Sequence, residues 1–396
     1  MLTLKVLLHA RALITSGAVF HSERSSLRSL AAHRINPIKL GIGCGFLLLL
    51  AILAAIAMGS VALPLSSVHA ALFGFHDSAK APIHVLGTNE ISEFQVQIIV
   101  QEFRSPRVLL AACIGAMPRL RGAVMQGLFR NPLADPSLIG VTAGAIAGAS
   151  LIIVFGSADF FIGWLPSELF AGGAIAGMTL VSLGACAGGS LTVWLVYRLA
   201  TTSAGTSVST MLLAGIAITA LTGSLSSWLE FTADNTMLRR ISIWRMGGLD
   251  GANYAGLILA ASCLAIIAMV LPRCARALNL LLLGESEARH LGVDVERLKL
   301  VLIVLVALAV GVSVALAGSI AFIGLIVPHI MRMLVGPDHR YLLPLAALGG
   351  AILLVIADCL ARIVIAPAEL PVGIITAVLG APFFISLLRY RHEYGF

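Results

Sequence analysis

The stretch Leu300-Val-Leu-Ile-Val-Leu-Val-Ala-Leu-Ala-Val-Gly-Val-Ser-Val-Ala-Leu316 contains no charged side chain. A helix needs roughly 20 apolar residues to cross the hydrocarbon core of a bilayer, and this run comes close to that length. The run lacks the apolar/polar alternation that marks the strands of a membrane barrel. It therefore predicts a membrane-spanning helix.

Nine further runs of the same kind lie along the 396 residues. The chain is 59% hydrophobic and 11% charged, with a mean hydropathy of +1.00, whereas about a quarter of a soluble domain is charged. We predict an all-α, polytopic membrane protein with about ten transmembrane helices. The other nine runs are Leu40–Leu63, Val108–Leu128, Leu138–Phe155, Phe170–Leu195, Met211–Phe231, Tyr254–Leu271, Ile320–Val335, Leu342–Ala361 and Val372–Leu388.

The positive charges set the expected orientation, because cytoplasmic loops are enriched in Lys and Arg. Arg119 and Arg121 lie within the second span in either orientation. With the N-terminus inside, seventeen of the 26 basic residues lie in cytoplasmic segments. The outer segments hold only Lys80, Arg104, Arg107, Arg239, Arg240, Arg245 and Arg362. We therefore predict cytoplasmic N- and C-termini. The net charge of +7 is too small to form a phosphate-binding face, so no nucleic-acid partner is expected.

Three regions are expected from this pattern. Residues 1–39 form a basic cytoplasmic extension, because their apolar stretch Ala12–Phe20 is interrupted and resembles no secretory signal. Residues 40–391 form the ten-span domain, with a polar cytoplasmic segment at 283–299, and residues 392–396 form a cytoplasmic tail.

Signatures of an enzyme or a metal site are missing. None of the four lysines precedes Ser or Thr, so the chain has no phosphate-binding Gly-Lys-Ser/Thr loop. His-Glu-x-x-His and Gly-x-Ser-x-Gly motifs are absent too. The six cysteines lie in or beside separate spans without a Cys-x-x-Cys pair. We expect no catalytic activity, no metal site and no cofactor bound by this chain.

Two features of the spans bear on movement and transport. Asp358 lies in the ninth span, where an ionised group costs several kcal/mol unless it faces protein or water. An ion-coupled carrier usually has a relay of such groups, so one Asp supports that alternative only weakly. Gly140, Gly144 and Gly148 recur every four residues, as do Gly173 and Gly177 in the fourth span. This spacing indicates close packing of helices or a helix contact that moves.

Three blocks of sequence carry a family resemblance. The first contains Arg104-Ser-Pro-Arg107 and Met125-Gln-Gly-Leu-Phe-Arg-Asn-Pro-Leu-Ala-Asp-Pro136. The second is Leu283-Gly-Glu-Ser-Glu-Ala-Arg-His-Leu-Gly-Val293, and the third is Gly318-Ser-Ile-Ala-Phe-Ile-Gly-Leu-Ile-Val-Pro-His-Ile-Met-Arg332. Together they resemble the permease subunit of type II ABC importers for iron–siderophore, haem and vitamin B12.

The resemblance implies partners as well as a fold. It implies ten spans in the bacterial inner membrane and a homodimer of this chain, surrounded by membrane lipid. Two ABC ATPase subunits, which hold ATP and Mg, would bind inside, and a periplasmic substrate-binding protein would deliver cargo from outside. Transport would then proceed by alternating access.

Three arginines are predicted to dock the binding protein. By the resemblance, Arg104, Arg107 and Arg362 are exposed cations that contact acidic residues of that partner, and such charges mainly steer encounter. Pro106 lies between the first two, where the start of a helix tolerates proline. Arginines that merely mark the membrane interface are the alternative.

The polar segment 283–299 is predicted to contact the ATPase. Gly284 and Gly292 punctuate it and Asp294 is a suitable cap for Val295–Lys299, so two short amphipathic helices fit. A plain solvated loop is the alternative. The resemblance makes the segment the coupling element, with contacts expected from Gly284, Glu285, Glu287, Ala288, Arg289, Leu291, Gly292 and Val293.

Residues of the gate and the translocation path are also implied. The inner gate is expected at Asn131 and Leu133, and at Val208 and Ser209 in the loop before the fifth span. The path is expected to include Arg119, Arg121, Arg239, Arg240 and Trp244.

Basic residues along this path favour an anionic cargo. Haem carries two propionates, so we expect haem, with a ferric siderophore second and cobalamin third. The alternative is that these arginines pair with Asp234, Asp250 or lipid headgroups.

Overall fold

The computed structural model describes residues 35–59, 61, 63–73, 92–128, 139–156, 174–203, 205–320 and 322–394. The regular secondary structure of this part of the chain is helical except for one antiparallel hairpin, β1 (Thr201–Thr202) with β2 (Gly205–Thr206). Ten helices coincide with the ten apolar runs: α3 (Pro37–Ala57), α6 (Ser105–Leu128), α7 (Val141–Phe155), α8 (Ala174–Ala200), α9 (Val208–Thr232), α11 (Tyr254–Leu281), α13 (Val295–Ala317), α14 (Ile323–Val335), α15 (His339–Ile363) and α16 (Val372–Tyr394).

Shorter elements join these helices: α4 (Leu65–Phe73), α5 (Glu93–Ile98), the π-helical η1 (Ile99–Arg104), α10 (Asn235–Met246) and α12 (Glu285–His290). In the described ranges, six helices are long and apolar enough to cross a bilayer, namely α3, α8, α9, α11, α13 and α15. Helices α7 and α14 and the first half of α16 are apolar but shorter. The chain is thus a multi-pass helical membrane protein, while the count of ten spans stays a prediction.

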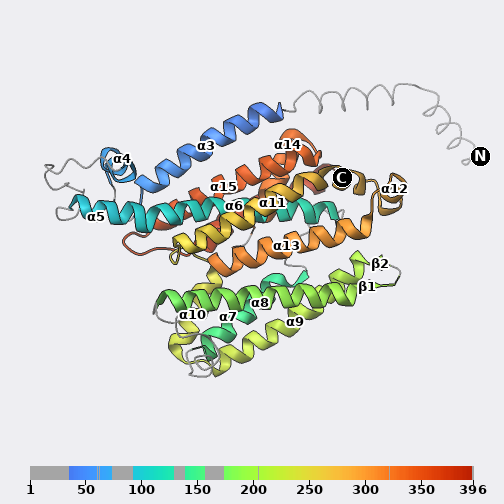
Figure 1. Ribbon diagram of the computed structural model, residues 1–396, viewed down its shortest axis with the longest axis horizontal. Coiled ribbons are helices and arrows are strands. Elements are labelled where there is room, and N and C mark those ends of the chain that lie inside the picture. The colour runs from blue at the N-terminus through green and yellow to red at the C-terminus, as the bar shows by residue number, and fades with distance from the viewer. Residues whose placement is uncertain are drawn as a thin grey trace, which may run out of the picture.

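Helix α13 lies between two groups of helices (Figure 1). On one side α15 packs along α6 and α3, and on the other α7 packs against α8 and α9. Helix α13 contacts α6 and α11 in the first group and α7 and α8 in the second. It is among the most buried helices together with α15, whereas α3 and α9 are mostly exposed. The core therefore runs along α13 and α15.

Four glycines bring α7 and α8 together. A Cβ atom on Gly144 would lie 2.7 Å from the Gly188 carbonyl oxygen, and one on Gly184 would lie 2.7 Å from the Gly148 oxygen. Both distances are too short for a real side chain, so the close helix packing predicted from Gly144 and Gly148 is confirmed. Their partners in α8 are Gly184 and Gly188, whereas the contacts of Gly173 and Gly177 lie outside what the structure describes.

The second apolar run belongs to a helix that begins much earlier than expected. A capping box at Ser92 starts helix α5, which continues through η1 into α6 and so extends from Glu93 to Leu128. The expectation that Pro106 stands at a helix start is wrong, because Pro106 lies well inside this continuous helix.

The π-helical segment explains how the helix accommodates its proline. The backbone N–H of Ser105 bonds to Val100, five residues back, and the Ser105 hydroxyl donates to the same oxygen over 2.7 Å. Because the Ser105 N–H bonds to Val100 and Pro106 has no N–H, the Gln101 carbonyl receives no backbone hydrogen bond from either residue. The Tyr254 hydroxyl of α11 donates to this carbonyl over 2.6 Å.

Other boundaries differ from the predicted ones as well, including one end each of α3, α13 and α16. Helix α3 begins at Pro37, inside the predicted extension of residues 1–39, because Asn36 caps it and proline suits the first turn. Helix α13 begins at Val295 instead of Leu300. Helix α16 continues to Tyr394, beyond the expected boundary at residue 391. No Gly or Pro interrupts the chain at either of the last two boundaries, so each helix continues.

Candidate functional site

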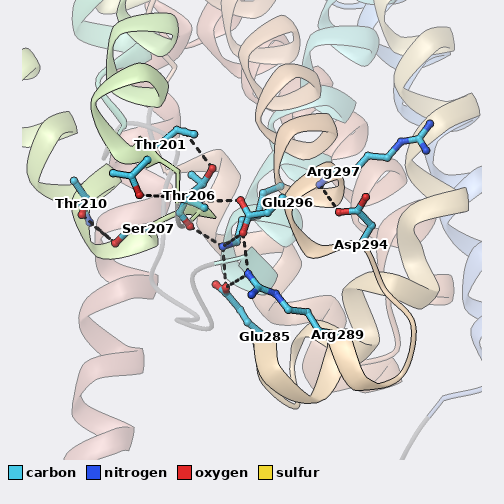
Figure 2. A network of polar contacts seen from close by, with 12 residues as sticks. Thr201, Thr206, Ser207, Thr210, Glu285, Arg289, Asp294, Glu296 and Arg297 are labelled. Carbon is cyan, nitrogen blue, oxygen red and sulfur yellow. Dashed lines mark hydrogen bonds and ion pairs between the residues drawn. The ribbon is translucent and has the colours of Figure 1, made fainter.

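A polar network occupies one end of the helix bundle, where α12, the β1–β2 hairpin and the start of α13 meet (Figure 2). Its centre is Lys299, whose side chain is only 1% exposed. The Lys299 ammonium donates to the Thr206 carbonyl over 2.7 Å and pairs with Glu285 over 2.8 Å. It also lies 3.4 Å from the Glu296 carboxylate. The three donors of the ammonium therefore have three acceptors.

Glu296 connects the same elements a second time. Its Oε2 atom accepts the backbone N–H of Thr206 over 2.8 Å, and its Oε1 atom pairs with Arg289 over 3.0 Å. Arg289 is also 3.9 Å from Glu285, one turn earlier in α12. Two cations and two carboxylates thus join a hairpin and a helix that are about 80 residues apart in sequence.

The hairpin leads directly into helix α9. Gly205 has φ of 114°, and a Cβ atom there would lie 2.9 Å from the Glu296 carboxylate, so only glycine suits this position. Ser207 follows, accepts the Thr210 backbone N–H over 3.3 Å and caps α9. The predicted gate residues Val208 and Ser209 lie in the first turn of α9 rather than in a loop.

The predicted coupling segment is only partly as expected. Asp294 is confirmed as a helix cap, since its carboxylate accepts the Arg297 backbone N–H over 3.0 Å. The expectation of two short helices is wrong, because only α12 is short and the second helix is the start of α13. Among the candidate contacts, Glu287, Arg289, Leu291 and Gly292 are exposed, Ala288 is buried, and Gly284, Glu285 and Val293 are half-buried.

Sequence reasoning overlooked Lys299 as a functional candidate. The available signal was that Lys299 is one of only four lysines and directly precedes a run without charge. Its burial depends on the hairpin, which is remote in sequence, so the pattern around Lys299 does not reveal its contacts.

A second charged cluster surrounds Asp358, which is fully buried. Arg107 Nε lies 2.9 Å from Asp358 Oδ1, and Arg107 Nη1 lies 2.7 Å from Glu369. Arg362 Nε lies 3.0 Å from Asp358 Oδ2, although its N–H is not directed at that oxygen, so this contact is an ion pair rather than a hydrogen bond. Asp358 is therefore a shared counter-ion of two arginines.

Two arginines donate hydrogen bonds to the backbone carbonyls at the C-terminal end of helix α3. Arg104 is 6% exposed and donates to the carbonyls of Ile56 and Ala57 over 2.8 Å each, and to that of Val61. Arg362 is 3% exposed and donates to Ala55 over 2.9 Å. The last carbonyls of a helix lack intrahelical partners and carry partial negative charge, which attracts a guanidinium.

The expectation that the three docking arginines are exposed is therefore wrong. Arg104 and Arg362 are buried, and the Arg107 side chain is 12% exposed and already paired. Whether Arg104, Arg107 or Arg362 contacts a binding protein stays a prediction.

Helix α10 lies at the opposite end from α12 (Figure 1), and its sequence contains Arg239, Arg240 and Arg245. Arg239 and Arg240 are exposed and form no ion pair with any described residue. Arg245 pairs with Glu230 over 2.9 Å, rather than with Asp234 or Asp250 as the alternative expected.

Asp234 instead caps helix α10. Hydrogen bonds from the backbone N–H of Met237 and from the hydroxyl and N–H of Thr236 lower the pKa of the Asp234 carboxyl below its usual value. The cap is thus charged at neutral pH.

The predicted path residue Trp244 lies in the last turn of α10, just before a tight turn. Gly247 has φ of 76° and ends the helix. The N–H of Gly248 donates to Ala317 over 3.0 Å, and the N–H of Gly373 donates to Gly247 over 3.3 Å. This turn anchors α10 to the ends of α13 and α16.

A third polar contact connects α11 with α15 near the predicted cytoplasmic surface. Asp338 caps α15, accepting the N–H of Arg340 over 3.0 Å and the side-chain amide of Asn279 over 2.7 Å. Partial burial raises the pKa of Asp338, but these hydrogen bonds and the Arg340 charge outweigh it and lower the pKa overall. Its contribution to stability is present above the ordinary pKa of about 4 and is lost as pH falls through the lowered value.

Some predicted residues cannot be placed. Asn131 and Leu133 lie outside the described residues. Arg119 and Arg121 belong to helix α6, but their side chains lie outside the described part, so their expected position on the path stays a prediction.

Comparisons with known proteins agree with this architecture. The family model described as the FecCD transport family matches residues 47–390. The hemin transport system permease protein HmuU of Yersinia pestis is 42% identical over 73% of this chain and 83% of its own length. The cobalamin import system permease protein BtuC of Halobacterium salinarum is 42% identical over 74% of each chain.

Two further matches extend the comparison. The vitamin B12 import system permease protein BtuC of Escherichia coli O157:H7 is 41% identical over 74% of this chain and 84% of its own length. A solved structure described as an inward-facing conformation of a transporter of the metal-chelate ABC type has a TM-score of 0.72 and 31% identity. It covers 89% of this chain and 99% of its own.

Proposed function

The chain belongs to the FecCD transport family, and we propose that it is the permease subunit of an ATP-driven importer that moves haem across the bacterial inner membrane. The observation that carries the proposal is the family match over residues 47–390, which extends from helix α3 to helix α16. The chain supplies the path by alternating access, and separate subunits hydrolyse ATP.

The proposed partners correspond to the two ends of the bundle. Two ATPase subunits bind at α12, where Glu287, Arg289 and Leu291 are exposed. A binding protein approaches the end that carries α10 and the arginine cluster around Asp358. A second copy of this chain completes the transport path, for which the exposed apolar side chains of α9, such as Leu213 and Ile216, offer a surface.

Haem is the proposed cargo because α10 contains Arg239 and Arg240, which are exposed, form no ion pair with any described residue and lie at the end proposed to face the incoming cargo. Two propionates complement such charge. Two other cargoes each have an observation in their favour. One cobalamin permease is 42% identical, the same as the hemin permease, and a second is 41% identical. The metal-chelate transporter structure fits a ferric siderophore.

The test is reconstitution in proteoliposomes with the ATPase and binding protein of the same transport system. Uptake of haem, ferric siderophores and cobalamin is measured with and without ATP. We expect ATP-dependent haem uptake that falls when Arg239 and Arg240 are both replaced by Gln, with ATPase assembly as the control. Uptake of cobalamin alone would overturn the proposed cargo.

The same experiment separates the proposal from an ion-coupled carrier. Such a carrier would move cargo under an ion gradient without the ATPase subunit or nucleotide. Uptake of that kind by the chain alone would overturn the proposed mechanism.

A further inference from the structure

The contacts of Lys299 join helix α12 and the start of α13, which are close in sequence, to the β1–β2 hairpin, which lies about 80 residues earlier in the chain. Its ammonium holds Glu285 of α12, Glu296 of its own helix and the carbonyl of Thr206. Thr206 ends the hairpin, and Ser207, the cap of α9, is the next residue. One buried cation thus stands between the exposed helix α12 and the first turn of α9.

We propose that Lys299 is a positioning residue that transmits displacement of α12 to the β1–β2 hairpin and so to the start of α9. This inference rests on the proposed function, in which the ATPase moves α12. It adds a physical link between that movement and Val208 and Ser209, the gate candidates in the first turn of α9.

The burial of Lys299 makes the connection stiff. The side chain is 1% exposed, so the protein partners, rather than water, stabilise the ammonium in this arrangement. If α12 moved alone, Glu285 would leave the ammonium and a buried charge would lose a counter-ion. Moving Lys299 and the hairpin together with α12 avoids this penalty, so the three segments are expected to move as one unit.

Glu296 reinforces the unit on the hairpin side. Its carboxylate accepts the Thr206 N–H, while Lys299 donates to the Thr206 carbonyl, so both backbone groups of one residue are held by α13. Gly205 lets the Glu296 carboxylate approach the hairpin. The bond from the Ser207 N–H to Ala200 over 3.0 Å closes the hairpin and connects it to α8.

The decisive variant is Lys299→Met, which keeps the length of the side chain and removes the charge. In the full complex we expect the cargo transported per ATP hydrolysed to fall about fivefold or more, the size of an ordinary coupling between two sites. Lys299→Arg, which keeps the charge, should restore part of the coupling. Lys39→Met is the matched control, because Lys39 is an exposed lysine at the N-terminal end of α3.

Hydrogen exchange of the complex provides a second measurement. A substitution at a merely structural residue would not separate the responses of two peptides to nucleotide. In the wild type, a non-hydrolysable ATP analogue should alter exchange in both peptides 285–293 and 201–210. In Lys299→Met the change in 285–293 should persist while the change in 201–210 is lost. If Lys299→Met does not assemble, Glu285→Gln removes the same Lys299–Glu285 ion pair from the α12 side, where the carboxylate is 31% exposed.

The outcomes separate this inference from the proposed function. A wild-type complex that moves no cargo with ATP contradicts the proposed function. A coupled wild type with an equally coupled Lys299→Met variant, whose hairpin still responds to nucleotide, contradicts the inference alone.

Discussion

Asp358 shows how a charge inside a membrane helix is stabilised. Alone in its span, this carboxylate resembles a site for ion-coupled transport. In the folded chain it is fully buried between Arg107 and Arg362, and Glu369 adds a second negative charge at Arg107. Its partners give it a structural role, so Asp358 no longer supports an ion-coupled carrier.

Replacing Asp358 tests this role. Asp358→Asn leaves Arg107 and Arg362 without their shared counter-ion, and we expect a loss of about 3–5 kcal/mol in the free energy of unfolding. Glu369→Gln is the matched control, since its carboxylate is 36% exposed, and should cost about 1 kcal/mol or less. Thermal unfolding in detergent measures both. Equal stability of the two variants would contradict the assignment.

At the scale of helices, the glycines of α7 and α8 set the distance between two neighbouring backbones. A Cβ atom on Gly148 would meet the backbone of Gly184 well inside van der Waals contact. Backbone atoms cannot rotate away as the end of a side chain can, so the helices themselves must separate. By contrast, the Cβ position of Gly43 in α3 has no atom within 4 Å among the described residues.

Two alanine substitutions should therefore have opposite effects. Gly148→Ala is expected to destabilise the protein by about 1–3 kcal/mol, because it overpacks the α7–α8 contact. Gly43→Ala should be neutral or stabilise it by about 0.5–1 kcal/mol, because alanine favours the helix. The midpoint of thermal unfolding compares them. A lower midpoint for Gly43→Ala than for Gly148→Ala would refute this interpretation.

Viewed as a whole, the molecule has two chemically different ends. Helix α12 and the hairpin lie at one end, and α10 lies at the other (Figure 1). The seventeen basic residues of the predicted cytoplasmic segments, against seven outside, favour the α12 end as cytoplasmic. The proposed ATPase and cargo-delivering protein would therefore approach different ends.

Two exposed arginines provide a matched test of this orientation. Arg240→Cys on α10 should react with a membrane-impermeant thiol reagent added to intact spheroplasts, whereas Arg289→Cys on α12 should react only after the membrane is opened. The wild type, with its six native cysteines, supplies the background. The opposite labelling pattern would reverse the predicted topology.

Features that depend on neighbours in sequence were predictable. The ten apolar runs mark ten helices, and Asp294 caps a helix as its position suggests. Pro106 misled the prediction, since a π-helical segment lets a proline stand inside a continuous helix. Arg104 and Arg362 misled it as well, because their burial depends on carbonyls at the end of α3, about 50 and 300 residues away in sequence.

The sequence by itself determined that this protein is a helical membrane protein of a transport family, since hydropathy and motifs are properties of continuous stretches. Only the tertiary structure decided which charges are buried and what holds them. Asp358 acquires its arginines, and Lys299 its carboxylates and hairpin, only when remote helices meet. The physical reason is that a charge in a low-dielectric interior is stabilised by the groups around it, and folding alone brings those groups together.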